Sequence, residues 1–248
     1  MTDSIAIVAS ALRADAEALR VISQNVANSQ TPAYRREVPL VYSTFDALAG
    51  VSPANASPEA DSAATSDPLR LDSSVDLRPG TLQSTGEPLN LAIEGNAFFV
   101  VDTARGERLT RRGDFRLDGE GRLVTASGDA VLGSNGAMQI RGAQPVIGTD
   151  GTVRAGDAVI DKVRLVEVPG AQSLKPEGDG LYALAEGTAP LDTAAAQVRQ
   201  GFIETSNVQS VDEMIALMEA MRRFESAQRF IRGYDSMLDN AITTLGKV

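Results

Sequence analysis

Carboxylates are the main side chains in this sequence that could carry out chemistry, because the usual nucleophiles and metal ligands are missing. The 248 residues include no histidine and no cysteine, which excludes Ser-His and Cys-His dyads, thiolate catalysis, disulfides and most zinc sites. Asp118, Glu120, Asp150 and Asp157 lie near glycine-containing turns, but their spacing does not match a calcium-binding loop. We therefore predict no metal site, we assign no catalytic residue and no cofactor, and we expect a protein without enzyme activity, with carboxylate chemistry as the alternative that the composition allows.

Two other function classes stay open on these residues. A hydrolase with two carboxylates would need an acidic pair in a substrate cleft, and tryptophan, the usual sugar platform, is absent. An extracellular β-rich binding module could use the triplet Arg112–Asp114 as an adhesion motif, although the flanking strands also explain it as a turn. Neither class accounts for the amphipathic ends of the chain.

The net charge limits the possible partners. With 33 acidic and 23 basic residues, the chain carries a formal charge of -10 and should repel phosphate backbones and anionic bilayers. No uninterrupted apolar run approaches the roughly 18 residues of a membrane span. The first 20 residues also lack the pattern of a secretory signal peptide, because Arg13, Asp15 and Glu17 fall where its apolar core would lie. We expect no nucleic acid partner, no bilayer insertion and no cleaved signal peptide.

The N-terminal segment has apolar residues at alternating steps of three and four. This period predicts a helix of about six turns with an apolar seam. Pro32 disfavours helical geometry at Thr31 and should end the helix near Asn28 or Ser29. The N-terminal seam consists of Ile5, Val8, Leu12, Leu19, Ile22 and Val26.

The C-terminal segment repeats the pattern over a longer span. Ser210 and Glu213 form a capping-box pattern at its start. A second apolar ridge, Val211, Ile215 and Met218, lies beside the C-terminal seam. We predict an α+β protein in which the N- and C-terminal helices pair in a coiled-coil-like manner. The C-terminal seam consists of Met214, Leu217, Met221, Phe224, Ile231, Leu238, Ile242 and Leu245.

Between the helices the period changes to short β-prone runs separated by glycine turns, which predicts an antiparallel β-rich domain. Phe98 and Phe99 are adjacent, so they should point to opposite faces of one strand and pack into cores. We divide the chain into a discontinuous helical assembly domain of residues 1–40 and 202–248, an extended linker of residues 41–80, and a β-rich domain of residues 81–201.

The two terminal seams suggest self-assembly. A hairpin of two helices buries little surface by itself, and the second ridge of the C-terminal helix exceeds what the shorter helix could cover. We therefore expect the helices to complete their burial against other subunits.

Three ordered blocks of sequence resemble a known family. NVANSQTPAYRRE (25–37), the block from Leu89 to Gly133, and GFIETSNVQSVDEMIALMEAMRRFESAQ (201–228) resemble the rod and hook subunits of the bacterial flagellum, its axial proteins. Two positions depart from the family pattern. Ala33 and Ala97 stand where glycines are expected.

This resemblance implies a structural subunit of the flagellar basal-body rod, in the periplasmic space, which polymerises with itself and with other rod subunits. It also implies export through the flagellar type III apparatus. The run Arg222–Glu225 is similar to the proximal rod members, with the distal rod members as the alternative. The family motif comprises Asn25, Asn28, Thr31, Pro32 and Tyr34.

Four arginines near these blocks have expected roles. Arg35 and Arg36 should be solvated or meet carboxylates of a neighbouring subunit, and we favour the solvated state because exposed ion pairs contribute only about 0–1 kcal/mol. Arg111 and Arg112 should form a small basic spot on the surface.

Overall fold

The computed structural model describes residues 2–43, 69–140, 145–156, 158–185, 187–193 and 196–245. The chain divides into two compact units. The first contains residues 1–26, 37–74 and 210–248, and the second contains residues 27–36 and 75–209. Of the predicted linker, residues 44–68 lie outside the described part of the chain, as does Asp157.

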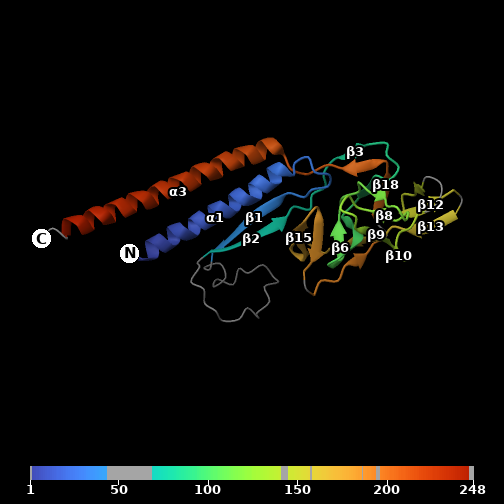
Figure 1. Ribbon diagram of the computed structural model, residues 1–248, viewed down its shortest axis with the longest axis horizontal. Coiled ribbons are helices and arrows are strands. Elements are labelled where there is room, and N and C mark those ends of the chain that lie inside the picture. The colour runs from blue at the N-terminus through green and yellow to red at the C-terminus, as the bar shows by residue number, and fades with distance from the viewer. Residues whose placement is uncertain are drawn as a thin grey trace. The chain divides into compact units, whose positions relative to one another are not determined.

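The first unit contains two long helices and a small sheet (Figure 1). Helix α1 (Thr2–Ala27) ends before Pro32, and α3 (Ser210–Leu245) begins at the serine of the capping-box pattern. Asp212 and Glu213 lie in the first turn of α3, where the positive end of the helix dipole favours acidic side chains. Strands β1 (Glu37–Ser43) and β2 (Leu69–Val75) pair with each other.

The two helices lie alongside each other in antiparallel directions, and polar side chains join them. Asn25 Nδ2 near the end of α1 donates to Glu213 Oε2 near the start of α3 at 3.3 Å. Ten residues earlier in α1 and ten residues later in α3, Arg223 Nε donates to Asp15 Oδ1, also at 3.3 Å.

The predicted coiled-coil-like pairing is wrong, although the α+β class agrees with the structure. The seam residues Met214 and Met221 are 52% and 49% exposed, whereas coiled-coil knobs are enclosed by the partner helix. On α3 the residues buried instead are Glu213 and Ala220, each one position earlier. The covered face of α3 is therefore centred on Glu213 and Ala220, and it includes only part of the predicted apolar seam.

The second unit consists of antiparallel β-structure. Its principal sheet has the order β15-β16-β6-β5-β9-β8-β7, with β10 on β9 and β14 between β5 and β17. A separate three-stranded sheet has the order β11-β12-β13. The strands are β3 (Leu82–Ser84), β4 (Leu91–Glu94), β5 (Ala97–Thr103), β6 (Gly106–Thr110), β7 (Arg116–Leu117), β8 (Leu123–Val124), β9 (Ala130–Gly133), β10 (Gly136–Ala137), β11 (Pro145–Ile147), β12 (Thr152–Ala155), β13 (Ala158–Lys162), β14 (Leu165–Glu167), β15 (Leu174–Gly178), β16 (Leu181–Leu184), β17 (Leu191–Asp192), β18 (Gln197–Gln200) and β19 (Phe202–Glu204).

Two late strands of this unit pair with early ones. Strand β18 pairs with β4, and Gln200 lies opposite Leu91. Strand β19 pairs with β3, and Glu204 lies opposite Leu82. The last part of the second unit is therefore held against its first part.

Strand β5 divides the hydrophobic core into two clusters. Phe99 is fully buried and meets Phe115 edge-on, with 5.1 Å between ring centroids. Its neighbour Phe98 belongs to the other cluster and meets Tyr182 edge-on at 6.0 Å. The expectation that these two phenylalanines point to opposite faces and pack into cores agrees with this arrangement.

Truncating Phe99 should strongly destabilise the second unit. We expect Phe99→Ala to lower the free energy of unfolding by about 3–5 kcal/mol, because a large cavity replaces a fully buried ring. Urea unfolding, followed by circular dichroism, measures the change. Val159→Ala is the control, because this side chain is 60% exposed and its truncation should cost less than about 0.5 kcal/mol. Equal losses in the two variants would contradict the assigned core.

Candidate functional site

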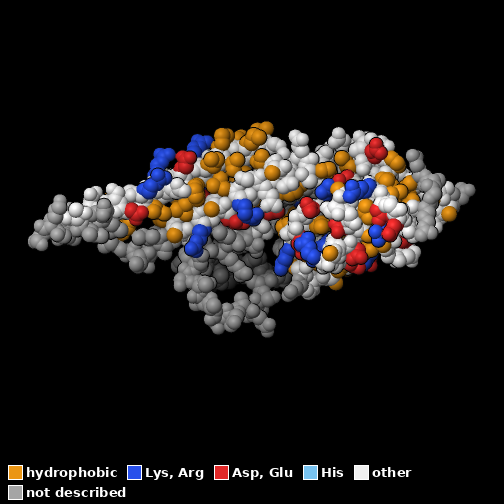
Figure 2. All heavy atoms as spheres, in the orientation of Figure 1, with side chains coloured by type: hydrophobic (Ala, Val, Ile, Leu, Met, Phe, Trp, Pro, Cys, Tyr) orange, Lys and Arg blue, Asp and Glu red, His pale blue; other side chains and the backbone are white. Residues whose placement is uncertain are grey.

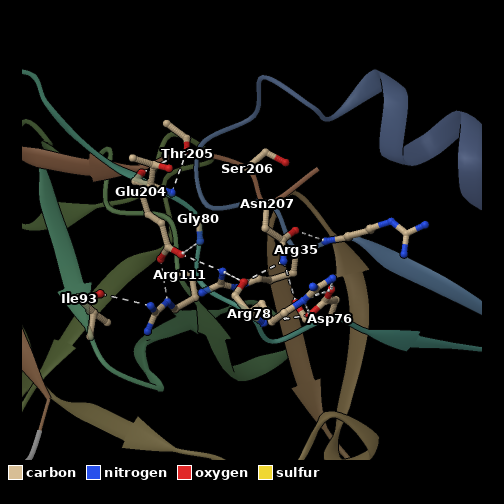
Figure 3. Close-up of polar contacts among 12 residues, drawn as sticks. Arg35, Asp76, Arg78, Gly80, Ile93, Arg111, Glu204, Thr205, Ser206 and Asn207 are labelled. Atoms are coloured by element: carbon tan, nitrogen blue, oxygen red, sulfur yellow. Dashed lines mark hydrogen bonds and ion pairs between the residues drawn. The ribbon is translucent and has the colours of Figure 1, made fainter. Parts of the chain in front are cut away.

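A buried ionic junction lies in the second unit, where the carboxylate of Glu204 meets two arginines (Figure 3). Arg35 Nη1 lies 2.8 Å from Glu204 Oε1, and Arg111 Nε donates to Glu204 Oε2 at 3.0 Å. The backbone N–H of Gly80 also donates to Oε1, at 2.8 Å. All three charged side chains are at most 2% exposed. We call Glu204, Arg35 and Arg111 the junction.

The junction joins three distant parts of the sequence. Arg35 comes from the segment after α1, Arg111 follows β6, and Glu204 is the last residue of β19. The backbone supports the same arrangement, because the N–H of Ala33 donates to the carbonyl of Glu204 at 2.8 Å. We call residues 28–36, between α1 and β1, the N-terminal arm. Glu204 binds this arm through both its side chain and its main chain.

The junction holds two positive charges and one negative charge away from water. Burial lowers the pKa of the Arg111 guanidinium from its usual value, and the Glu204 carboxylate opposes that shift. Arg111 also donates to the carbonyls of Ile93, Gly95 and Ala97. Carbonyl oxygens thus compensate for much of the water that this guanidinium loses.

Arg35 is less completely satisfied. Its Nη1 donates to the carbonyl of Arg78 at 2.6 Å as well as contacting Glu204. Within the described residues, its Nε is the one buried side-chain polar atom that has no hydrogen-bond partner. An unsatisfied buried donor costs about 1–3 kcal/mol. The ion pair with Glu204 helps to offset this cost, so burial of Arg35 depends on the Glu204 carboxylate.

The uncharged side chain of Asn207 forms further hydrogen bonds beside the junction (Figure 3). Its Oδ1 accepts from the backbone N–H of Arg36 at 2.7 Å. Its Nδ2 donates to the carbonyls of Asp76 and Arg78 at 3.0 and 2.8 Å. A hydrogen bond from Arg78 lowers the pKa of the Asp76 carboxyl. Asn207 therefore connects the arm, the start of the β-structure and the segment leading to α3.

In the first unit, Asn25 has a comparable connecting role. Its Oδ1 accepts from the backbone N–H of Glu37 at 2.9 Å, and its Nδ2 donates to the Glu37 carbonyl at 2.8 Å. The contact with Glu213 adds α3 to the same residue. Asn25 is fully buried, so its amide joins α1, β1 and α3.

An apolar face of α3 is exposed, and Figure 2 shows hydrophobic side chains gathered over the first half of this helix. The residues follow one another at helical spacing, so they form a continuous stripe. Contiguous exposed apolar patches of this kind mark interaction sites. We call this stripe the α3 ridge; it consists of Val211, Met214, Ile215, Met218 and Met221, which are 48–70% exposed.

Other kinds of site are not evident in the described residues. No group of three acidic side chains there is arranged to hold a metal ion. Among the described residues, no helix is long and apolar enough to cross a membrane.

Two family models match separate parts of the chain. The model for the C-terminal region of flagellar basal body rod FlgEFG proteins matches residues 199–244. The model for the D1 domain of the flagellar hook proteins FlgE/F/G matches residues 92–155. The first match includes Glu204 and the α3 ridge, and the second includes Arg111.

Curated relatives match nearly the whole chain. The flagellar basal-body rod protein FlgF of Caulobacter vibrioides is 31% identical over 237 residues, covering 93% of this chain and 92% of the relative. FlgF of Escherichia coli K12 is 30% identical over 237 residues, with 89% and 88% covered. FlgG of Bacillus subtilis is 33% identical over 245 residues, with 90% and 92% covered.

The chain belongs to the flagellar basal-body rod protein family. FlgF proteins are favoured among its relatives, with FlgG next. The family is structural, so the predictions of a basal-body rod subunit without enzyme activity are confirmed.

The rod-family motif forms the turn between α1 and β1. The N–H and Oγ1 of Thr31 donate to the carbonyl and Oδ1 of Asn28 at 3.0 and 3.1 Å, and Pro32 follows at a half-buried position. Tyr34 is buried, and its carbonyl accepts from the N–H of Asn207 at 3.3 Å. Asn25 lies earlier, within α1, where it makes the contacts given above.

The residues of the N- and C-terminal seams differ in burial. Ile22 is buried, while Met214 and Met221 are exposed. The seam side chains at Ile5, Leu238, Ile242 and Leu245 lie outside the described part. The remaining seam residues are half-buried: Val8, Leu12, Leu19, Val26, Leu217, Phe224 and Ile231.

Sequence reasoning missed the junction. Arg35 and Arg111 were both expected at a surface, yet each binds Glu204 within the same chain. Arg112 is partly exposed and pairs with Asp114 at 2.7 Å. The available signal was a charged residue at the end of the apolar run Phe202–Glu204, but nothing in the sequence indicated which arginines it would meet.

Neutralising Glu204 should be severely destabilising. Glu204→Gln leaves two buried guanidinium groups without an opposite charge, and breaking a buried ion pair in this way costs about 3–5 kcal/mol. Urea unfolding measures the loss. Glu225→Gln is the matched control, because Glu225 forms an exposed pair with Arg229 on α3 and should contribute less than about 0.5 kcal/mol. A Glu204→Gln protein as stable as this control would contradict the assigned junction.

Restoring the expected glycine at position 33 should stabilise the protein. Ala33 has φ of 55°, a left-handed conformation that costs a residue with a Cβ about 1–2 kcal/mol. We expect Ala33→Gly to gain up to about 1 kcal/mol, because the greater flexibility of glycine in the unfolded chain offsets part of the relief. Ala97→Gly is the control, because Ala97 is buried within strand β5. This second change should destabilise, and a gain from it would contradict the explanation.

The buried Glu37 carboxyl should make stability depend on pH. Burial raises the pKa of Glu37 above its usual value, although the charge of Arg20 acts the other way. The folded state thus binds this proton more tightly than the unfolded chain, so the contribution of Glu37 to stability falls as pH rises through its raised pKa. We expect Glu37→Gln to raise the thermal midpoint at neutral pH, and the gain to vanish below about pH 4. A gain that persisted in acid would refute this assignment.

Proposed function

We propose that this protein is a subunit of the proximal rod, within the periplasmic part of the flagellar basal body. Membership of the rod family, with FlgF relatives favoured, supports this position. The distal rod is the alternative, because FlgG relatives match a similar share of the chain. The export route that we propose is the flagellar type III apparatus, and the partners are other rod subunits and further copies of the same chain.

The α3 ridge carries this proposal. Its five residues are exposed, whereas Glu213 and Ala220 on another face of the same helix are buried. The ridge is therefore an apolar surface that the rest of the described chain leaves uncovered. Three of the five are methionines, whose flexible side chains adapt to differently shaped partners. A rod subunit that contacts non-identical neighbours would benefit from such a surface.

We also propose the division of labour that the chain organisation suggests. Residues 1–40 and 202–248 would provide the assembly contacts, residues 41–80 the connection, and residues 81–201 the β-rich part. Within the assembly segments, the half-buried seam residues and the ridge would complete their burial against neighbouring subunits.

Acidic residues on the ridge should abolish rod assembly without unfolding the protein. We expect Ile215→Asp combined with Met218→Asp to prevent complementation of a strain that lacks this gene, because each charge would have to be buried at a subunit contact. Electron microscopy of isolated basal bodies measures rod formation, and circular dichroism of the purified variant checks the helices.

The control places one acidic residue elsewhere on α3. Ser226→Asp adds an acidic side chain at an exposed position beyond the end of the ridge and to one side of it and should leave rods intact. Normal rods in the ridge variant would contradict the role of the ridge. Normal filaments in the strain without the gene would contradict the rod function itself.

A further inference from the structure

The outer face of the three-stranded sheet combines a cation with exposed apolar groups. Val146 on β11 lies opposite Arg154 on β12, which in turn lies opposite Val159 on β13. Residues opposite one another in antiparallel strands share a face. Both valines are 60% exposed, and Arg154 is also exposed. We call these three residues the Arg154 face.

Arg154 differs from the other described arginines of the second unit. Arg122, for example, pairs with Asp118 at 2.7 Å, and Arg112 pairs with Asp114 at the same distance. Beside the Arg154 guanidinium, the described residues include no hydrogen-bond or ion-pair partner. In a chain of net charge -10, an arginine between two exposed valines is the chemistry of an interface anchor, because arginine with surrounding apolar contacts is typical of binding hot spots.

A complementary depression lies elsewhere in the same unit. It has a volume of about 580 Å³, within the range of pockets that bind small molecules. Three carboxylates line it, and Arg164 bridges two of them by contacting Glu107 and Asp192, each at 3.2 Å. The third carboxylate, Asp102, is exposed. The depression therefore has an excess of negative charge.

Apolar groups accompany these carboxylates, as valines accompany Arg154. Leu132 and Ala137 line the depression. Leu191, next to Asp192 in strand β17, is 62% exposed. The two surfaces thus match in both respects that matter for recognition, because opposite charges can pair while apolar groups around them exclude water.

We infer that the Arg154 face of one copy docks into the Asp102 depression of a second copy of this chain. The Arg154 guanidinium enters the depression and pairs with the Asp102 carboxylate, and Val146 and Val159 cover its rim. Each copy carries both surfaces, and the two surfaces share no residue. Contacts between unlike surfaces of identical subunits can build rings or open helical arrays.

This contact rests on the proposed assembly role and adds to it a contact between the β-rich parts of neighbouring copies. It involves no residue of α3, so it is separable from the α3 ridge. An interface centred on one ion pair should also weaken as salt rises, because salt screens exposed charges.

Cross-linking between two full-length variants tests the contact outside the cell. The natural chain contains no cysteine, so a disulfide can form only between introduced thiols. One variant carries Val159→Cys, beside Arg154, and the other carries Ser134→Cys, which lines the depression. We expect a cross-linked dimer on mixing the two variants under mild oxidation, more than either variant gives alone, and less of it at high salt.

Charge exchange then identifies the pair. Arg154→Glu in the first variant should lower the initial rate of cross-linking by about tenfold, because it sets like charges against each other. Asp102→Arg in the second variant should do the same, and combining the two should restore the rate. The controls are Lys175→Glu and Glu87→Arg, which change exposed residues elsewhere in the unit and should leave the rate unchanged.

Each outcome bears on the inference. Restoration by the paired exchange would support it. If each charge change slowed cross-linking but their combination did not restore the rate, the assigned partner surface would be overturned. If Arg154→Glu or Asp102→Arg alone left the rate unchanged, the contact itself would be overturned. The assay contains only this protein, so its failure is distinct from a failure of the rod function, which the strain lacking the gene tests separately.

Discussion

The closure of the second unit depends on one buried carboxylate. Glu204 is placed between Arg35 and Arg111 at distances of 2.8 and 3.0 Å, and its main chain also binds the arm that follows α1. The N-terminal arm, the β-structure and the segment before α3 therefore share one electrostatic centre. A buried ion pair contributes little net stability compared with apolar packing, but losing one member is costly.

Local patterns in the sequence predicted the elements better than their faces. The period of apolar residues and the capping-box pattern located both helices, because these signals are encoded within a few turns. Which side of α3 is covered depends on Asn25, Glu213 and the Asp15–Arg223 pair, and these are contacts between residues about 190–210 positions apart. The excess of apolar residues on α3 therefore predicted the ridge. It did not determine how α3 packs on α1, because that packing involves the long-range contacts just named.

The two departures from the family pattern show what sequence comparison can and cannot tell. Both are alanines at expected glycine positions, yet Ala33 has a positive φ and Ala97 lies in a regular buried strand. Glycine is expected at position 33 because the backbone there has a positive φ, which glycine adopts without strain. The family pattern alone does not show this reason, and the geometry of the turn does. The junction was hidden for a related reason, because neither Arg35 nor Arg111 carries a local sign of burial.

The pairing of β3 with β19 and of β4 with β18 has a consequence for the timing of folding. Residues 82–84 and 91–94 find their partner strands only at residues 202–204 and 197–200, so their contacts close loops of more than 100 residues. Such long-range contacts form slowly, because chain entropy must be lost before they add stability. A chain that becomes available from its N-terminus onward cannot complete this unit until about four-fifths of its length has been released. If the polypeptide is delivered in that order, folding of this unit is delayed until strands β18 and β19 are available.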